Sequence, residues 1–327
     1  IRDSDTVAFG SSRDLRPSGT ILFVNCPYPT LDADAVPLAE LTIGPECSVP
    51  YRTQSLFNIS AMSYGAISEP AVRALSAGAK KAGIWMNTGE GGLSQYHLEG
   101  GADIVFQIGT AKYGVRDAHG QLSDEKLREV ANHEQVRMFE IKLSQGAKPG
   151  KGGILPGSKV TQEIANIRLI PTGEDSLSPN RHPDISDEGD LLDMIDRVRR
   201  ATGKPVGFKA VVGAYGWLES LFQEVRRRGL ESAPDFITID SADGGTGAAP
   251  MSLIDYVGIP VKESLPLVVD LLVKHNLRDR IKVVASGKMI TPAEAAWAIC
   301  AGADFVASAR GFLFALGCIQ ALQCNKN

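Results

Sequence analysis

The sequence has no long apolar segment, little net charge and few cysteines. None of its apolar runs reaches the roughly 20 residues that a membrane-spanning helix requires. The formal net charge of the 327 residues is −4, which gives no reason to expect a nucleic acid or an anionic membrane as a partner. The five cysteines are too scattered for a disulfide framework, so we expect a reducing, cytoplasmic setting.

Motifs of several common enzyme classes are also missing. No G-x-G-x-x-G opens a strand–helix–strand unit, which argues against a nicotinamide-binding domain within this chain. The sequence contains no Walker loop, no H-E-x-x-H and no G-x-S-x-G, and its five histidines form no convincing metal cluster. The composition, with 43% hydrophobic and 22% charged residues, is typical of a soluble globular protein.

Three glycine-rich stretches stand out among what is present, and each follows an apolar run that is typical of a strand. Glycine allows backbone N–H groups to approach a ligand closely and to turn without strain. Such loops, placed just after strands, build ligand sites at one end of a sheet or barrel. Their recurrence predicts an enzyme with a bulky phosphorylated cofactor. The three stretches are residues 87–92, 145–153 and 243–250.

From about residue 55 onward, short β-branched runs alternate with amphipathic segments of helix length. Eight such runs with intervening helices match a (β/α)8 TIM barrel, which typically takes ~250 residues. An open doubly wound sheet is the alternative, although eight units exceed what most open sheets use. We expect an N-terminal extension over residues 1–50 that packs on a barrel formed by residues 51–327. The predicted strands are 56–62, 84–87, 104–108, 138–143, 206–212, 236–240, 281–285 and 305–307, and the predicted helices are 69–82, 124–134, 188–201, 216–228, 261–275 and 292–301.

Polar residues follow or end the predicted strands, where barrel enzymes place their site residues. Lys209 lies in an otherwise apolar strand, where an unpaired charge is costly. We therefore interpret Lys209 as a site cation able to hold the N1–C2 region of a flavin, with a surface lysine as the alternative. Glu90 is either a surface residue or, because its neighbours are small, a residue that faces a ligand. The other candidates are Ser63, Thr88, Gln107, Gln145, Lys148, Ser241, Asp243, Thr246, Ser286, Lys288 and Arg310.

The loops after the last two predicted strands suit a phosphate group. They read Ser286-Gly287-Lys288 and Ser308-Ala309-Arg310-Gly311, and the second opens a helix. Small residues, helix N-terminal amides and cations together favour a dianion, and phosphate sites in barrels often lie in these two loops. The alternative is that the glycines are ordinary turn residues.

Cys318 and Cys324 form a C-x₅-C pair near the end of the chain. This is not the C-x₂-C spacing of common zinc sites. An iron–sulfur cluster requires three or four thiolates. The pair is therefore either part of a cluster that this chain does not complete or a pair of buried structural thiols.

Five motifs, in the same order, resemble the FMN-binding synthase domain of glutamate synthase. They occupy residues 59–66, 87–92, 145–157, 243–250 and 317–324, and the resemblance runs from about residue 55 to the C-terminus. The first 50 residues are more similar to the compact, stand-alone relatives. The resemblance implies an FMN-containing (β/α)8 barrel. In this family, reduced FMN passes a hydride to the 2-iminoglutarate made from 2-oxoglutarate and ammonia, which gives L-glutamate.

The resemblance also implies roles for individual residues. Glu90 would lie near the substrate and handle protons as ammonia condenses. Gln145 and Lys148 would bind the 2-oxo acid beside the flavin, and Arg168 would clamp a carboxylate with its planar guanidinium. The residues expected to hold FMN are Met62, Ser63, Thr88, Gly89, Gln107, Lys209, Ser241, Asp243, Gly244, Gly245, Thr246, Gly247, Ser286, Gly287, Lys288, Ala309 and Arg310.

The sequence departs from the family pattern at several places. Ile154 stands where the family commonly has a substrate-binding glutamine, and Lys151 stands where it commonly has glutamate. The third ligand of a 3Fe–4S cluster, after Cys318 and Cys324, would fall beyond Asn327. The glutaminase domain is absent, so nitrogen would come from free ammonia, an amine or a partner subunit. Electrons would come from a partner protein or ferredoxin.

Two other functions are alternatives. One is a different FMN-dependent barrel oxidoreductase that acts on a small oxo or hydroxy acid. Oxidation of a hydroxy acid would require a histidine base near the flavin, and no histidine lies at a predicted strand end. The other is a barrel subunit without catalytic activity, which the presence of Glu90, Lys148, Arg168 and Lys209 disfavours.

Overall fold

The computed structural model describes residues 23–24, 26–146, 149, 152–242, 249–250, 252–253 and 256–319. The chain divides into two compact units, Ile1–Pro37 and Leu38–Asn327. Among its described residues, the first unit contains the short 3-10 helix η2 (Asp32–Asp34). The second unit contains the elements that position the site.

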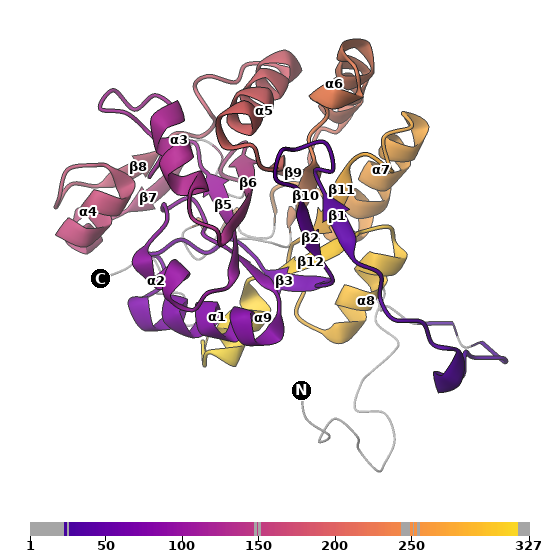
Figure 1. The fold of residues 1–327 in the computed structure, drawn as a ribbon. Coiled ribbons are helices and arrows are strands. Elements are labelled where there is room, and N and C mark those ends of the chain that lie inside the picture. The colour runs from indigo at the N-terminus through magenta and orange to yellow at the C-terminus, as the bar shows by residue number, and fades with distance from the viewer. Residues whose placement is uncertain are drawn as a thin grey trace. The chain divides into compact units, whose positions relative to one another are not determined.

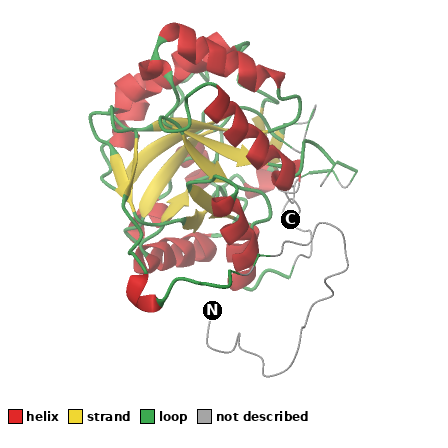
Figure 2. Ribbon diagram, turned by 90° about the vertical axis from the view of Figure 1, so that its right-hand side faces the viewer, coloured by secondary structure: helices red, strands yellow, loops and turns green. Residues whose placement is uncertain are grey.

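Within the described part of the second unit, eight parallel strands hydrogen-bond in chain order and close into a barrel. Figure 1 follows these strands along the chain, and Figure 2 shows them inside a layer of helices. The closed barrel confirms the predicted TIM-barrel fold and excludes the open sheet. The strands are β3 (Phe57–Ile59), β4 (Trp85–Asn87), β5 (Asp103–Ile108), β6 (Val136–Lys142), β9 (Val206–Val211), β10 (Phe236–Asp240), β11 (Lys282–Ala285) and β12 (Phe305–Ser308).

The helices between the strands confirm the six predicted segments to within three residues at each end. Local sequence sets several of their limits. In α8, Thr291 caps the amide of Glu294 and Pro292 takes the first turn, where its missing N–H costs little. The helix α1 ends at Gly83, which adopts a left-handed conformation. The six are α1 (Glu69–Ala82), α3 (Asp124–Ala131), α5 (Glu188–Thr202), α6 (Gly216–Arg228), α7 (Val261–Lys274) and α8 (Pro292–Cys300).

Further elements were not predicted from the sequence. The segment 144–186 contains a two-stranded antiparallel sheet and short helical pieces. Another two-stranded antiparallel sheet precedes the barrel. The unpredicted elements are β1 (Leu41–Ile43), β2 (Tyr51–Thr53), α2 (Gln95–Glu99), β7 (Gly153–Leu155), η3 (Gly157–Lys159), α4 (Gln162–Arg168), β8 (Ser176–Ser178) and η4 (Leu230–Ser232); the short α9 (Arg310–Ala315) is the helix expected after the last strand.

Alternation along each strand separates an outer core from the barrel interior. On β6, Phe139 and Ile141 belong to the large apolar cluster shared with the surrounding helices. Met138 faces the interior and packs in a second apolar cluster with Trp85 and Phe236. The inward-facing residues that follow on β6 are polar, so the interior changes from apolar to polar toward the C-terminal ends of the strands.

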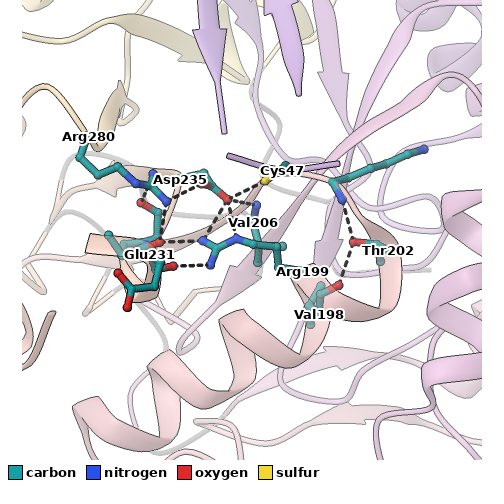
Figure 3. A network of polar contacts seen from close by, with 11 residues as sticks. Cys47, Val198, Arg199, Thr202, Val206, Glu231, Asp235 and Arg280 are labelled. Carbon is teal, nitrogen blue, oxygen red and sulfur yellow. Dashed lines mark hydrogen bonds and ion pairs between the residues drawn. The ribbon is translucent and has the colours of Figure 1, made fainter. Parts of the chain in front are cut away.

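The opposite, N-terminal end of the barrel is held by a buried ionic network (Figure 3). The fully buried side chain of Asp235 lies 3.0 Å from Arg199 Nη2 and 2.9 Å from Arg280 Nη2. It also accepts the backbone N–H of Val206 at 2.8 Å and lies 3.6 Å from the thiol of Cys47. One carboxylate thus joins α5, the starts of β9 and β10, the residues before β11 and the loop between β1 and β2.

Candidate active site at the barrel mouth

The mouth, by which we mean the C-terminal strand ends and the loops after them, carries a cluster centred on Glu90. Its carboxylate is 3.0 Å from Lys142 Nζ and accepts a 3.0 Å hydrogen bond from Gln145 Nε2. Ser178 donates to the other carboxylate oxygen at 3.3 Å. The Glu90 and Lys142 side chains are 15% and 19% exposed, so the pair is largely removed from water but is not sealed. The structure thus brings together Glu90 and Gln145, two of the residues expected at the site.

A buried carboxylate lies one layer deeper in the barrel. Glu140 is 2% exposed and accepts hydrogen bonds from Asn87 Nδ2 at 2.8 Å and Gln107 Nε2 at 2.6 Å. Thr238 donates its hydroxyl to the second oxygen. The donors come from β4, β5 and β10, so a single side chain from β6 links four strands across the interior.

Lys209 lies beside this layer and forms an ion pair with Asp240 at 3.1 Å. Burial lowers the pKa of Lys209, but the carboxylates of Asp240, Glu140 and Glu90 more than offset this effect, and the net pKa is raised. The side chain therefore remains an ammonium ion. Its Cα lies in register with that of Lys142 on the neighbouring strand β6, so two cations face the same end of the barrel.

The loop after β4 lies directly against the backbone after β3. Gly89 has φ +65°, and a Cβ at this position would lie 2.5 Å from the amide nitrogen of Ser63 and 2.7 Å from the carbonyl carbon of Met62. Only glycine permits this approach. The buried Thr88 uses its hydroxyl to donate to Gly89 O and to accept the amide of Gln107. The structure therefore brings these five predicted residues together.

The loops after β10, β11 and β12 also converge. Gly287 has φ +110°, and a Cβ at this position would overlap the hydroxyl of Ser241. Ser286 Oγ lies 3.3 Å from Ser60 Oγ. Ser308 Oγ donates to the carbonyl of Met289 and accepts the amide of Gly311 at 3.2 Å, so that amide is engaged within the protein. Lys288, Ala309 and Arg310 are half-buried in these loops.

Arg168 is buried at the end of α4. Its Nη1 donates to Ser176 Oγ at 2.8 Å, its Nη2 donates to the carbonyl of Tyr64 at 3.1 Å, and its guanidinium lies over the ring of Tyr113. Burial lowers its pKa. Its Nε is buried and has no partner among the described residues. A Cβ on Gly91 would lie 3.3 Å from Nη2, so Arg168 adjoins the loop that carries Glu90.

Some predicted site residues cannot be placed. Lys148, Lys151, Asp243, Gly244, Gly245, Thr246, Gly247 and Cys324 lie outside the described residues. Cys318 is exposed, which argues against the interpretation of the cysteine pair as buried structural thiols. No group of three metal-ligating side chains occurs among the residues that the structure describes.

Sequence reasoning missed Lys142, Glu140 and Asn87. The signal was available, because Glu140 and Lys142 are charges in a predicted apolar strand, as Lys209 is. The segment 181–184, which lies outside the predicted helices and strands, also reaches the mouth. The fully buried His182 lies beside the backbone of Ile108 and Lys142 at the ends of β5 and β6. Asp184 forms an ion pair with the buried Lys112.

The burial of His182 predicts a dependence of stability on pH. Burial and the nearby charge of Lys112 lower its pKa to about 4. Unfolding restores the ordinary value near 6.5, so the unfolded state binds more protons between these limits. His182 therefore removes up to about 3 kcal/mol of stability as the pH falls from 6.5 to 4, and has no such effect above 6.5. His182→Phe should show a correspondingly smaller loss in urea unfolding between pH 7 and pH 4.5. An unchanged loss would contradict this assignment.

Comparisons with known proteins identify the family. A model for the conserved region in glutamate synthase matches residues 30–327. The glutamate synthase large subunit-like protein YerD of Bacillus subtilis is 47% identical over 282 residues, which are 86% of this chain and 53% of that protein. An archaeal-type glutamate synthase (NADPH) of Dehalococcoides mccartyi is 36% identical over 266 residues, which are 81% and 50% of the two chains. The chain spans about half the length of these curated relatives.

Solved structures resemble the fold. A lactate oxidase of Pediococcus acidilactici has a TM-score of 0.53 at 14% identity, over 89% of this chain and 72% of that one. A flavocytochrome b2 variant has a TM-score of 0.53 at 15% identity, over 82% and 60%. At such identities the likeness concerns the barrel fold alone.

None of the helices in the described ranges combines the length and apolar character needed to cross a membrane. With its family match over residues 30–327 and its 47% identity to a relative, the chain belongs to the glutamate synthase family.

Proposed function

We propose that this chain is an FMN-binding synthase barrel that reduces the imine formed from 2-oxoglutarate and ammonia, or an amine, to L-glutamate or an N-substituted glutamate. The observation that carries the proposal is the charged cluster at the mouth. Glu90 contacts Lys142 and Gln145, Lys209 pairs with Asp240, and the buried ammonium ion of Lys209 lies within electrostatic reach of Glu90. Family membership supports the same reaction.

The residues at the mouth fit FMN. Lys209 stays charged in a buried position, which suits an anionic edge of a flavin. Gln107 and the loop closed by Gly89 would line the ring, and the converging loops with Ser286, Lys288 and Arg310 would hold the phosphate, as would residues 243–247. When bound in its reduced form, FMN supplies the hydride.

The other mouth residues would handle the substrate. Glu90 would accept a proton from the nitrogen as ammonia adds to the oxo acid and would return it to the oxygen that leaves as water, and Lys142 holds its carboxylate in place. Gln145 and Lys148 would bind the oxo acid, and Arg168 would offer its unpartnered Nε to a carboxylate. The electron donor would be a separate protein or subunit.

Ile154 bears on which acid is bound. It lies on β7, opposite Leu177 of β8, and its side chain is 39% exposed. The adjacent Gly153 faces Glu90 and Gln145, so alternation along the strand turns position 154 away from that cluster. We therefore propose that recognition of the acid depends on Gln145 and Arg168 rather than on residue 154.

Removing the buried cation should weaken cofactor binding. Lys209→Met should lower the affinity for FMN about 10- to 100-fold, because a hydrogen bond to a charged group is lost. Lys204→Met is a matched control. Lys204 is also buried, but its ammonium donates to the carbonyls of Ala131, His133 and Val136 at the other end of the barrel. Titration of the flavin-free variants should show a loss for Lys209→Met alone.

The reaction itself can be tested under anaerobic conditions with photoreduced protein. Mixing with 2-oxoglutarate and ammonia together should reoxidise the flavin and yield one glutamate per flavin. Either compound alone should leave the flavin reduced. Reduction of the oxidised protein by a 2-hydroxy acid, without reoxidation by oxo acid and ammonia, would instead support a hydroxy-acid oxidase.

The structure gives no support to the hydroxy-acid alternative. His182 reaches the mouth, but its ring is fully buried and its pKa is lowered by burial. A general base must contact the substrate, and the buried ring of His182 is not accessible to a substrate.

A further inference from the structure

Glu140 occupies a central place in the barrel that the proposed reaction does not use directly. Its carboxylate is buried and receives three hydrogen bonds, from Asn87, Gln107 and Thr238. Burying a carboxylate to this extent costs free energy unless hydrogen bonds or an opposite charge compensate it. Hydrophobic residues could fill the same space, since Trp85, Met138 and Phe236 line the small cavity beside it.

The hydrogen bonds of Glu140 fix the orientation of two amides. An ionised carboxylate accepts hydrogen bonds and donates none, so the amide nitrogens of Asn87 and Gln107 must face it. The carbonyl oxygen of Asn87 is thereby turned to accept the backbone N–H of Gly89 at 2.9 Å. The carbonyl oxygen of Gln107 is turned away from Glu140. The orientation of both amides, and the seat of the Gly89 loop, thus depend on one carboxylate.

Glu140 also contributes charge. On β6 it pairs in register with Gly207 of β9, and Lys209 lies two residues further on the same face. Lys209 is in register with Thr238, which donates to Glu140 from the far side of β9. The carboxylate therefore lies within the electrostatic reach of Lys209 and contributes to the rise in its pKa.

We propose that Glu140 is the positioning residue of this site: it fixes the orientation of Gln107 and of the Asn87–Gly89 turn and places a negative charge near Lys209. The proposal rests on FMN being bound at the mouth. Gln107 would then offer its amide oxygen as a hydrogen-bond acceptor to the cofactor. The negative charge of Glu140 disfavours the added negative charge of reduced flavin, so it lowers the reduction potential.

Two variants separate the orienting role from the charge. In Glu140→Gln, Oε1 still accepts from both amides and the new NH₂ group donates to the hydroxyl of Thr238, so the geometry is kept and the charge is lost. Its affinity for FMN should remain within about threefold of wild type, and its reduction potential should be more positive. In Glu140→Leu, both amides lose their acceptor and are free to turn. Its affinity for FMN should fall at least tenfold, with a changed flavin absorption spectrum.

Asp304→Asn is the matched control. Asp304 is a largely buried carboxylate that pairs with Arg278 at 3.0 Å and accepts the amide of Val283 at the opposite end of the barrel. This variant should change neither the affinity for FMN nor the potential. Failure of the wild-type chain to bind FMN would overturn the proposed function. FMN binding by the wild type, with an unchanged potential in Glu140→Gln, would overturn the charge role of Glu140, even if Glu140→Leu does not fold. Wild-type affinity for FMN in folded Glu140→Leu would overturn its orienting role.

Discussion

Replacing Asp235 with alanine should lower the free energy of unfolding by about 3–5 kcal/mol. The side chain is fully buried, and its removal leaves the guanidinium groups of Arg199 and Arg280, which are 14% and 12% exposed, without their carboxylate. The backbone N–H of Val206 loses its acceptor as well. Breaking one partner of a buried ion pair is costly because the remaining charge stays buried.

Urea unfolding measures this effect, and Asp196→Ala provides the control. Asp196 pairs with Arg200 on the surface of α5, where the two side chains are 46% and 74% exposed. Exposed pairs of this kind contribute up to about 0.5 kcal/mol. A loss below about 1 kcal/mol in Asp235→Ala would show that the network in Figure 3 does not hold the N-terminal end of the barrel together.

Gly89→Ala should cost about 3 kcal/mol or more and should abolish the binding of FMN. The residue has a positive φ, which is unfavourable for alanine by roughly 1–2 kcal/mol. The added methyl group would also meet the backbone of Met62 and Ser63, which cannot move without shifting β3 or its loop. Overpacking of this kind adds about 1–3 kcal/mol.

Gly83→Ala is the control that separates the cost of a positive φ from the cost of the steric clash. Gly83 has φ +67°, close to the +65° of Gly89, but a Cβ at this position meets no atom within 4 Å. Gly83→Ala should lose only the roughly 1–2 kcal/mol of stability that alanine costs at a positive φ, and it should bind FMN as the wild type does. Equal stability losses in Gly89→Ala and Gly83→Ala would mean that the close approach of the Gly89 loop to residues 62–63 does not contribute to the stability loss of Gly89→Ala.

Much of the fold could be predicted because the barrel is built from local patterns. Every barrel strand overlaps one of the predicted apolar runs, and the ends of α1 and α8 carry recognisable glycine, proline and capping residues. The two-stranded β7–β8 sheet could not be predicted in the same way. Its strands have three residues each and lie among glycines and prolines, so pairing and not periodicity defines them.

The sequence indicates candidate site residues where a single residue conflicts with its surroundings. Lys209 is a charge in an apolar strand, and the structure places it beside Asp240. Glu140 meets the same criterion on β6. Its importance depends on three donors from other strands, and the sequence does not show which distant residues converge on it. The engagement of Arg168 by Ser176 and Tyr64 likewise depends on tertiary structure.

A titration of the flavin-free chain with FMN, monitored by flavin fluorescence, tests the proposed flavin site most directly. We predict saturable binding of one FMN per chain, at the mouth where Glu90, Lys142 and Lys209 lie. An absence of saturable binding by folded protein would contradict the central claim that this end of the barrel is a flavin site.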